Sequence, residues 1–251
     1  MRRLLLIVSV LTFATGAMAQ LQGVMYPAQM PREQIIHHKT FSLSYNSSYV
    51  MPSWVIYNVT NSMVDKTITV KAKYKPDPLV EARPATKKDY KDAGYLMAQF
   101  VNYLDVMQIE GAADETFYLT NITPMKLAFY KNVWLKTEDL IRLWATGKKG
   151  FEVICGPVLT DAPFPTIGVN KVSVAARFYK IVYDPENQQA IAFLFKNGSV
   201  SGTLKSRAVT VDEIEKLTGI DFFPELDDET ESALESVIDY NFWDFKAEEK
   251  L

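Results

Sequence analysis

The fold of this chain is decided by residues 116–145, which read TFYLTNITPMKLAFYKNVWLKTEDLIRLWA. The apolar residues 116–119 predict a short strand. Side chains suited to burial then recur at spacings of three and four, which predicts a helix from about Tyr130 to Ala145, with Gly147 as its stop. The buried face of that helix would consist of Trp134, Thr137, Ile141 and Trp144. The stretch therefore predicts a strand followed by a helix.

Runs with strand character lie on both sides of this stretch. Residues 41–45 alternate apolar and polar side chains, and residues 54–59 follow after a break that contains a proline. The two runs together predict a hairpin. Residues 66–91 are rich in lysine and proline and predict a loop with at most short strands. Further strands are expected at residues 151–159, 172–183 and 190–195.

Two helices are expected after the last strand. Thr210 and Glu213 have the spacing of a capping box, and Gly219 would close that helix. A second helix is expected around Glu229 to Asp239, with its acids on a solvated face. Strands, a helix, and then strands and helices, without regular βαβ alternation, predict an α+β fold. We expect one domain with a central, mainly antiparallel sheet flanked by helices.

The first residues have the pattern of a secretory signal peptide. Arg2 and Arg3 precede an apolar run at residues 4–13, and Ala17-Met18-Ala19 is a small-x-small cleavage site. The run is too short to span a bilayer, so we expect an exported chain without a membrane anchor, periplasmic or secreted. The predicted organisation is a signal peptide at 1–19, an N-terminal arm at 20–34, one domain at 35–245 and a tail at 246–251.

Charge and cysteine content narrow the function classes. The formal net charge is −3, and cleavage after Ala19 would remove two arginines and change it to −5. An acidic chain has no general attraction for nucleic acid, so such binding would need a local basic face. Cys155 is the sole cysteine, which excludes an internal disulfide, and its apolar neighbours predict a buried, inert thiol.

The residues by themselves offer little recognisable chemistry. The sequence has no GxGxxG or Walker loop and no GxSxG, CxxC or HExxH motif. The two histidines, His37 and His38, are neighbours in the chain, which is a poor spacing for a metal site. We expect one imidazole to pack at the start of a strand and the other to lie in solvent.

A series of short motifs occurs in the order found in one nuclease family. They are residues 35–46 with 52–57, Asp89-Tyr90 with Ala93-Gly94-Tyr95, residues 116–124, Trp134 with Glu138, residues 154–158, residues 167–172 with 178–180, and residues 210–224. Each motif is weak by itself, but together they cover most of the mature chain. The sequence therefore resembles the DNA/RNA non-specific endonucleases. This resemblance implies a ββα-metal nuclease fold over residues 35–245.

The resemblance also implies a catalytic site in which a D-R-G-H motif follows Ala93-Gly94-Tyr95. The four motif positions fall on Leu96-Met97-Ala98-Gln99, so Gln99 stands where the family has its general-base histidine. An amide has no basic nitrogen at neutral pH. The family asparagine that holds Mg²⁺ corresponds to Tyr130, and a phenol is a poor ligand for a hard cation. The base and the metal ligand are therefore both replaced.

Glu138 and Arg142 match the family's helix residues that support the metal's water shell and hold the phosphate. Because they are four residues apart on one helix, an i, i+4 salt bridge also explains them. Leu96 and Met97 place apolar groups where an ion and a phosphate need polar ones. If chemistry were retained, the remaining sources of ligands near the site would be Asp92, Asp105 and, after a slip of the helix register, Asn132.

We therefore expect an exported, catalytically inactive relative that acts as a binding or interaction module, with no cofactor. The alternative is a metal-dependent DNA/RNA endonuclease with an altered site, which would use Mg²⁺ beside Glu138. A third hypothesis is a nucleic-acid binder that no longer cleaves. Its basic strip would consist of Lys126, Lys131, Lys136, Arg142, Lys148 and Lys149. The resemblance further implies a homodimer, and the sequence does not indicate the physiological partner.

Overall fold

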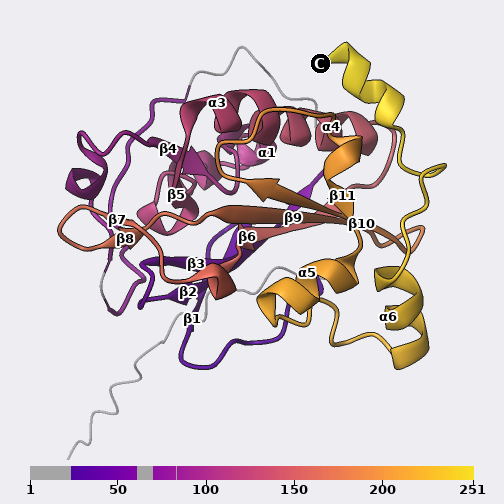
Figure 1. Cartoon of the computed structure of the whole chain (residues 1–251), viewed down its shortest axis with the longest axis horizontal. Coiled ribbons are helices and arrows are strands. Elements are labelled where there is room, and N and C mark those ends of the chain that lie inside the picture. Colours follow the sequence, from indigo (N-terminus) through magenta and orange to yellow (C-terminus); the bar gives the residue numbers. More distant parts are fainter. Residues whose placement is uncertain (1–23, 61–69, 83) are drawn as a thin grey trace, which may run out of the picture.

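Seven strands form the central sheet in the order β1-β2-β3-β6-β9-β10-β11, and each neighbouring pair is antiparallel (Figure 1). The computed structural model describes residues 24–60, 70–82 and 84–251. The predicted α+β architecture and the hairpin of β2 and β3 are confirmed. The strands are Gln34–His37 (β1), Phe41–Asn46 (β2), Met51–Val59 (β3), Phe151–Pro157 (β6), Arg177–Asp184 (β9), Gln189–Lys196 (β10) and Ala208–Val209 (β11).

Alternation along the strands gives the sheet two buried faces. In β9, Phe178 and Val182 belong to one hydrophobic cluster, whereas Tyr179 and Ile181 belong to another. Successive side chains of a strand point to opposite faces, so β9 is buried on both sides. Both faces of the sheet therefore need covering elements.

Helices cover the two faces from opposite sides (Figure 1). One face is covered by α3 (Leu127–Phe129), a π-helical turn at Tyr130–Trp134 and α4 (Leu135–Ala145). The other is covered by α5 (Val211–Thr218) and α6 (Asp228–Glu235), which pack into the second cluster. The helix predicted between Tyr130 and Ala145 is confirmed, with a π-helical first turn that the spacing of its apolar residues did not reveal.

The predicted caps of α5 are also confirmed. The backbone N of Glu213 donates to Thr210 Oγ1 at 3.2 Å, and the Glu213 carboxylate accepts from the backbone N of Thr210 at the same distance. Gly219 ends the helix with φ of 71°, a left-handed conformation that favours glycine. Local chemistry at both ends of α5 therefore fixes its bounds.

Smaller elements lie outside the central sheet. β4 (Leu96–Gln99) pairs antiparallel with β5 (Ile122–Met125), and β7 (Thr166–Ile167) pairs with β8 (Val172–Ser173). Short helices and turns complete this part: α1 (Tyr103–Val106), α2 (Ala112–Glu115) and 3-10 turns at Lys87–Tyr90, Leu119–Asn121, Leu159–Asp161, Lys205–Arg207 and Phe245–Lys250.

The strand predicted at residues 116–119 is wrong. This segment is a turn that leads into the 3-10 turn at Leu119–Asn121, and the strand begins at Ile122. Asn121 Nδ2 donates to the backbone oxygens of Thr116 and Val101, each at 2.9 Å. Within this segment the strand-like pairing is limited to one parallel bridge between Tyr118 and Lys75.

The expected helix around Glu229 to Asp239 is shorter than predicted and ends at Glu235. The expectation that its acids form a solvated face is wrong at Glu235, which is 4% exposed because the end of α6 packs against α5 and β10. Cys155 is buried, as expected, and burial raises the pKa of its thiol to about 12. The thiol therefore stays protonated at neutral pH.

The structure describes the C-terminal end of the chain, and at the other end its description begins at Val24. Residues 1–19, the expected signal peptide, lie outside the described residues. Within the arm, the backbone N of Ala28 donates to the backbone oxygen of Asp221 at 2.8 Å. Near the C-terminus, Ala247 packs into the core. In the part of the chain that the structure describes, no helix has the length and apolar character needed to cross a membrane.

Candidate functional site

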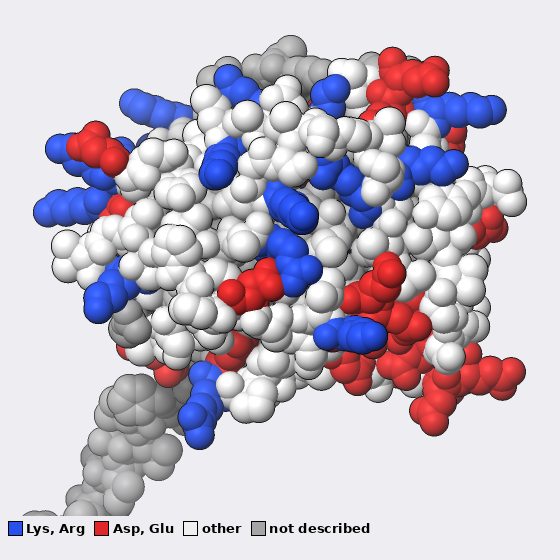
Figure 2. All heavy atoms as spheres, in the orientation of Figure 1, with Lys and Arg blue, Asp and Glu red and all other residues white. Residues whose placement is uncertain are grey.

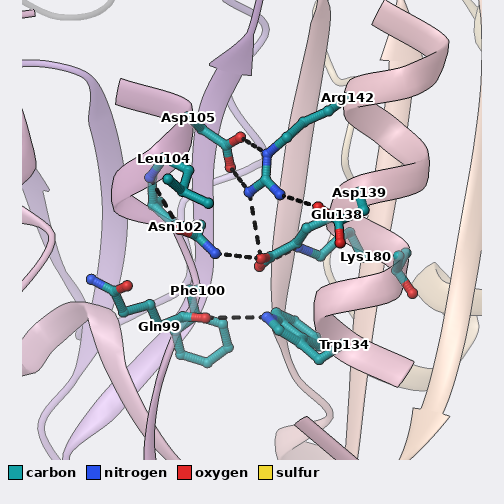
Figure 3. Close-up of polar contacts among 12 residues, drawn as sticks. Gln99, Phe100, Asn102, Leu104, Asp105, Trp134, Glu138, Asp139, Arg142 and Lys180 are labelled. Atoms are coloured by element: carbon teal, nitrogen blue, oxygen red, sulfur yellow. Dashed lines mark hydrogen bonds and ion pairs between the residues drawn. The ribbon is translucent and has the colours of Figure 1, made fainter. Parts of the chain in front are cut away.

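Glu138 lies in a buried ionic cluster between α4 and the central sheet (Figure 3). Its side chain is 2% exposed. Asn102 Nδ2 donates to Glu138 Oε2 at 2.8 Å, and Lys180 Nζ lies 3.4 Å from Oε1. Arg142, one turn along α4, places Nη2 3.6 Å from Oε2. Both carboxylate oxygens therefore have partners within the protein.

Lys180 is a partner of Glu138 that the sequence analysis missed. It lies on β9 between Phe178 and Val182, on the same face, and is 0% exposed. Its Nζ lies 4.2 Å from the centre of the Trp134 ring. Burial raises the pKa of Glu138, and the positive charges of Lys180 and Arg142 act in the opposite direction. Lys180 stands at an inward-facing position of an apolar strand. A buried lysine is almost always paired, so this pattern could have indicated an acid opposite it.

The guanidinium of Arg142 is held by three acids. Its Nε and Nη2 donate to the two oxygens of Asp105 at 2.6 and 3.2 Å, and Nη1 donates to Asp139 at 2.9 Å. Burial by itself would lower the pKa of Arg142, but Asp105 and Glu138 raise it above its ordinary value. The expected contact with Glu138 is present, yet the bidentate partner is Asp105. Arg142 is therefore engaged in ion pairs within the protein.

Gln99, which was expected at the position of the family's general base, is a buried amide with its own structural partners. The side chain is 5% exposed and points away from Glu138 (Figure 3). Its Nε2 donates to Thr116, to the backbone oxygen at 3.0 Å and to Oγ1 at 2.9 Å. Its backbone oxygen accepts from Trp134 Nε1 at 3.2 Å. Gln99 thus joins β4 to the turn before β5 and to the helix.

Tyr130, at the position of the metal asparagine, is partly buried in the first turn of the helix. Burial, and after it the negative charge of Glu138, raise the pKa of the Tyr130 phenol, so the phenol stays protonated at neutral pH. Asn132 is exposed and donates to the backbone oxygen of Ala128 at 2.8 Å, within its own helix. The amide nitrogen of Asn132 is therefore bound to the backbone of the helix that carries it.

These residues do not fit a magnesium ion. Mg²⁺ takes oxygen ligands in a near-octahedral arrangement and retains several waters. Glu138 shares its oxygens with three donors, and Tyr130 offers a protonated phenol. Asp105 is bound to Arg142, and Asp92 is exposed in the turn before β4, with φ of 56°. The carboxylates of Glu138 and Asp105 are thus both engaged by donors within the protein.

The two histidines have separate environments. His38 is buried, with Nε2 2.9 Å from Asp77 Oδ2 and its ring stacked on Tyr118. His37 is partly exposed, and its Nδ1 lies 2.8 Å from Ser42 Oγ. Burial by itself would raise the pKa of Asp77, but hydrogen bonds from His38 and Thr120 lower it. The packing of one imidazole was expected, and His38 is that residue. Its pairing with the carboxylate of Asp77 was not expected.

The six basic residues of the expected nucleic-acid strip do not form a free strip. Arg142 is bound by acids, Lys148 Nζ lies 3.2 Å from Asp184, and Lys149 Nζ lies 2.8 Å from Glu186. Lys126 and Lys131 are exposed. Half of the expected strip is therefore paired with acids.

Comparisons with known proteins agree with this fold. A sequence model described as DNA/RNA non-specific endonuclease matches residues 19–229. The mitochondrial nuclease EXOG of Danio rerio is 27% identical over 222 residues, which are 81% of this chain and 65% of that protein. A nuclease of Serratia marcescens is 27% identical over 214 residues, which are 80% of this chain and 79% of that protein.

The chain spans 56% to 65% of the length of the EXOG proteins of Danio rerio, Mus musculus, Xenopus laevis and Homo sapiens. A crystal structure of the EndoG/EndoGI complex matches with a TM-score of 0.70 at 22% identity, covering 78% of this chain and 88% of that chain. One conclusion follows from the central antiparallel sheet, the helices on its two faces and the match to most of the sequence. The chain belongs to the DNA/RNA non-specific endonuclease family.

Proposed function

We propose that this chain is a non-catalytic member of its family, in which the nuclease fold serves as a binding or interaction module. The observation that carries the proposal is the state of Gln99. The residue at the expected general-base position is a buried amide whose Nε2 donates to Thr116. An amide cannot accept a proton from water at neutral pH, and this one is held by its hydrogen bonds.

The environment of Glu138 supports the same proposal. In a working metal site the carboxylate would have to keep lone pairs for the ion or its waters. Here those lone pairs face Asn102, Lys180 and Arg142. These contacts support a structural role for the cluster, as an ion network that fixes α4 on the sheet.

The curated relatives are named nucleases, so the alternative of an active enzyme needs a direct test. The purified chain is incubated with supercoiled plasmid and with single-stranded RNA, in Mg²⁺, Mn²⁺ or EDTA. We expect cleavage per mole of protein at least about 10²–10⁴-fold slower than by an active family nuclease, because the general base is replaced.

A matched variant separates residual activity from contamination. Glu138→Gln keeps the shape of the side chain and removes its charge, and folding is checked by thermal unfolding. Cleavage that is sensitive to EDTA and is lost in Glu138→Gln would establish the active alternative. Cleavage that is equal in both proteins comes from a contaminant. DNA retention that falls steeply with salt, without cleavage, would favour the nucleic-acid binder.

We also propose that the chain is exported and cleaved after Ala19, on the pattern of residues 1–19. Expression in a bacterial host with an intact secretion system should give a mature protein that begins at Gln20. Mass spectrometry of the periplasmic fraction measures this directly. Full-length protein confined to the cytoplasm would contradict the proposal. The homodimer that the family resemblance implies stays a prediction.

A further inference from the structure

Helices α5 and α6 lie on the face of the sheet opposite α4 (Figure 1), and between them they carry a cluster of three carboxylates. Asp212, Glu215 and Glu235 each place one oxygen within 4.8 Å of the other two. Figure 2 shows acidic side chains gathered over this part of the surface. Exposed acids often cluster without a ligand, so the buried member of the group decides what the cluster means.

Glu235 is the buried member. It is 4% exposed, and its Oε1 has no hydrogen-bond partner among the described residues. A buried carboxylate oxygen without a partner is costly. Glu235 is also the last residue of α6, where the partial negative charge of the helix end disfavours an acid. The position calls for a positive charge beside the carboxylate.

Among the described residues, no lysine, arginine or histidine forms an ion pair with Glu235. The charged groups that act on Glu235 are themselves acids: Glu215, Glu231, Asp212 and Asp221. The ion pairs within the described ranges all lie elsewhere. The backbone N of Phe222 donates to Glu215 Oε1 at 2.8 Å, which orients that carboxylate and leaves its other oxygen available.

We propose that Asp212, Glu215 and Glu235 bind one calcium ion, which fastens α6 to α5. Ca²⁺ takes six to eight oxygen ligands at about 2.3–2.6 Å, so two oxygens on one ion lie at most roughly 5 Å apart. The observed separation of at most 4.8 Å meets this condition.

The donor set also selects the kind of ion. All three ligands are carboxylates, without the imidazole or thiolate that softer metals prefer. Ca²⁺ accepts irregular geometry and completes its shell with water, for which exposed Asp212 leaves room, whereas Mg²⁺ demands a near-ideal octahedron. The site lies on the face of the sheet opposite Glu138, so the proposal does not depend on the proposed function.

The test measures thermal unfolding of the full chain after removal of metal with EGTA. Samples at pH 7 contain no divalent ion, 5 mM CaCl₂ or 5 mM MgCl₂, at matched ionic strength. We expect Ca²⁺ to raise the Tm by about 5 °C or more if its concentration is 100 times the Kd. Isothermal titration with CaCl₂ should give one site per chain.

Two variants locate the effect. Glu235→Gln keeps the shape of the ligand and removes its charge, and we expect it to fold without metal and to abolish both the Tm shift and the calorimetric signal. Glu229→Gln removes an exposed acid from the same helix and should leave both unchanged.

Three results would overturn the proposal. One is an unchanged Tm of the wild-type chain in CaCl₂, which would mean that a proton balances Glu235. Another is an equal Ca²⁺ response in Glu235→Gln, which would place the ion elsewhere. The third is a Mg²⁺ response as large as the Ca²⁺ response, which would contradict the assignment to calcium.

Discussion

Replacing Lys180 with methionine should lower the free energy of unfolding by about 3–5 kcal/mol, the usual cost of removing one partner from a buried ion pair. The ammonium of Lys180 lies 3.4 Å from Glu138 Oε1 and has no contact with solvent. Methionine fills a similar volume beside Trp134, so packing changes little, but Glu138 then keeps only Asn102 and Arg142. Urea unfolding at neutral pH measures the change.

A double-mutant cycle attributes this loss to the ion pair. The variant Lys180→Met with Glu138→Gln should be more stable than the sum of the two single changes predicts, with a coupling of about 0.5–3 kcal/mol. Lys196→Met, at the exposed end of β10, is the matched control and should change stability by less than about 0.5 kcal/mol. An equal, small effect at both lysines would mean that Glu138 is uncharged in the folded protein.

Much of the fold could be predicted from the sequence, because local chemistry determines it. The bounds of α5 follow from the capping box of Thr210 and Glu213 and from the stop at Gly219. The apolar spacing that ends at Trp144 predicted the helix along the sheet. One failure arose from a local hydrogen bond that the apolar pattern does not reveal. Residues 116–119 predicted a strand, yet the side chain of Asn121 donates to the backbone oxygen of Thr116 and the segment is a turn.

The family resemblance assigned positions to the candidate site, but it did not predict which side chains pair there. The motif order placed Gln99, Tyr130, Glu138 and Arg142. The other partners of Glu138 and Arg142 come from different elements. Asn102 and Asp105 lie in the segment after β4, and Lys180 lies on β9. A helical spacing of four reveals the contact of Glu138 with Arg142, but it contains no information about residues across the sheet.

The same limit explains the misplaced acid of α6. The excess of acids near the C-terminus indicated a solvated face, and most of those acids are exposed. Glu235 differs because α6 ends against α5, which buries its last turn. Composition predicts the average environment of a segment, whereas the single buried acid depends on how two helices meet.

Rebuilding the family motif should restore cleavage if the frame of the site is intact. The variant combines Leu96→Asp, Met97→Arg, Ala98→Gly and Gln99→His on β4 with Tyr130→Asn on the helix. An imidazole at position 99 can accept a proton from water, and an amide at position 130 can bind a hard cation. Glu138 and Arg142 already lie on the adjoining helix, so no further change is made.

We expect this variant to cleave plasmid DNA in Mg²⁺ at least about 100-fold faster than the parent chain, the lower end of what a general base contributes. The matched control carries the other four changes but keeps Gln99, and it should stay at the parent rate, because it lacks the base. EDTA should abolish the gain. The loss of the bonds from Gln99 to Thr116 will lower the Tm, so circular dichroism must establish that both variants are folded. A folded variant without activity would show that β4 does not present these positions to a shared cleft, which would contradict the assignment of Gln99 to the position of the base.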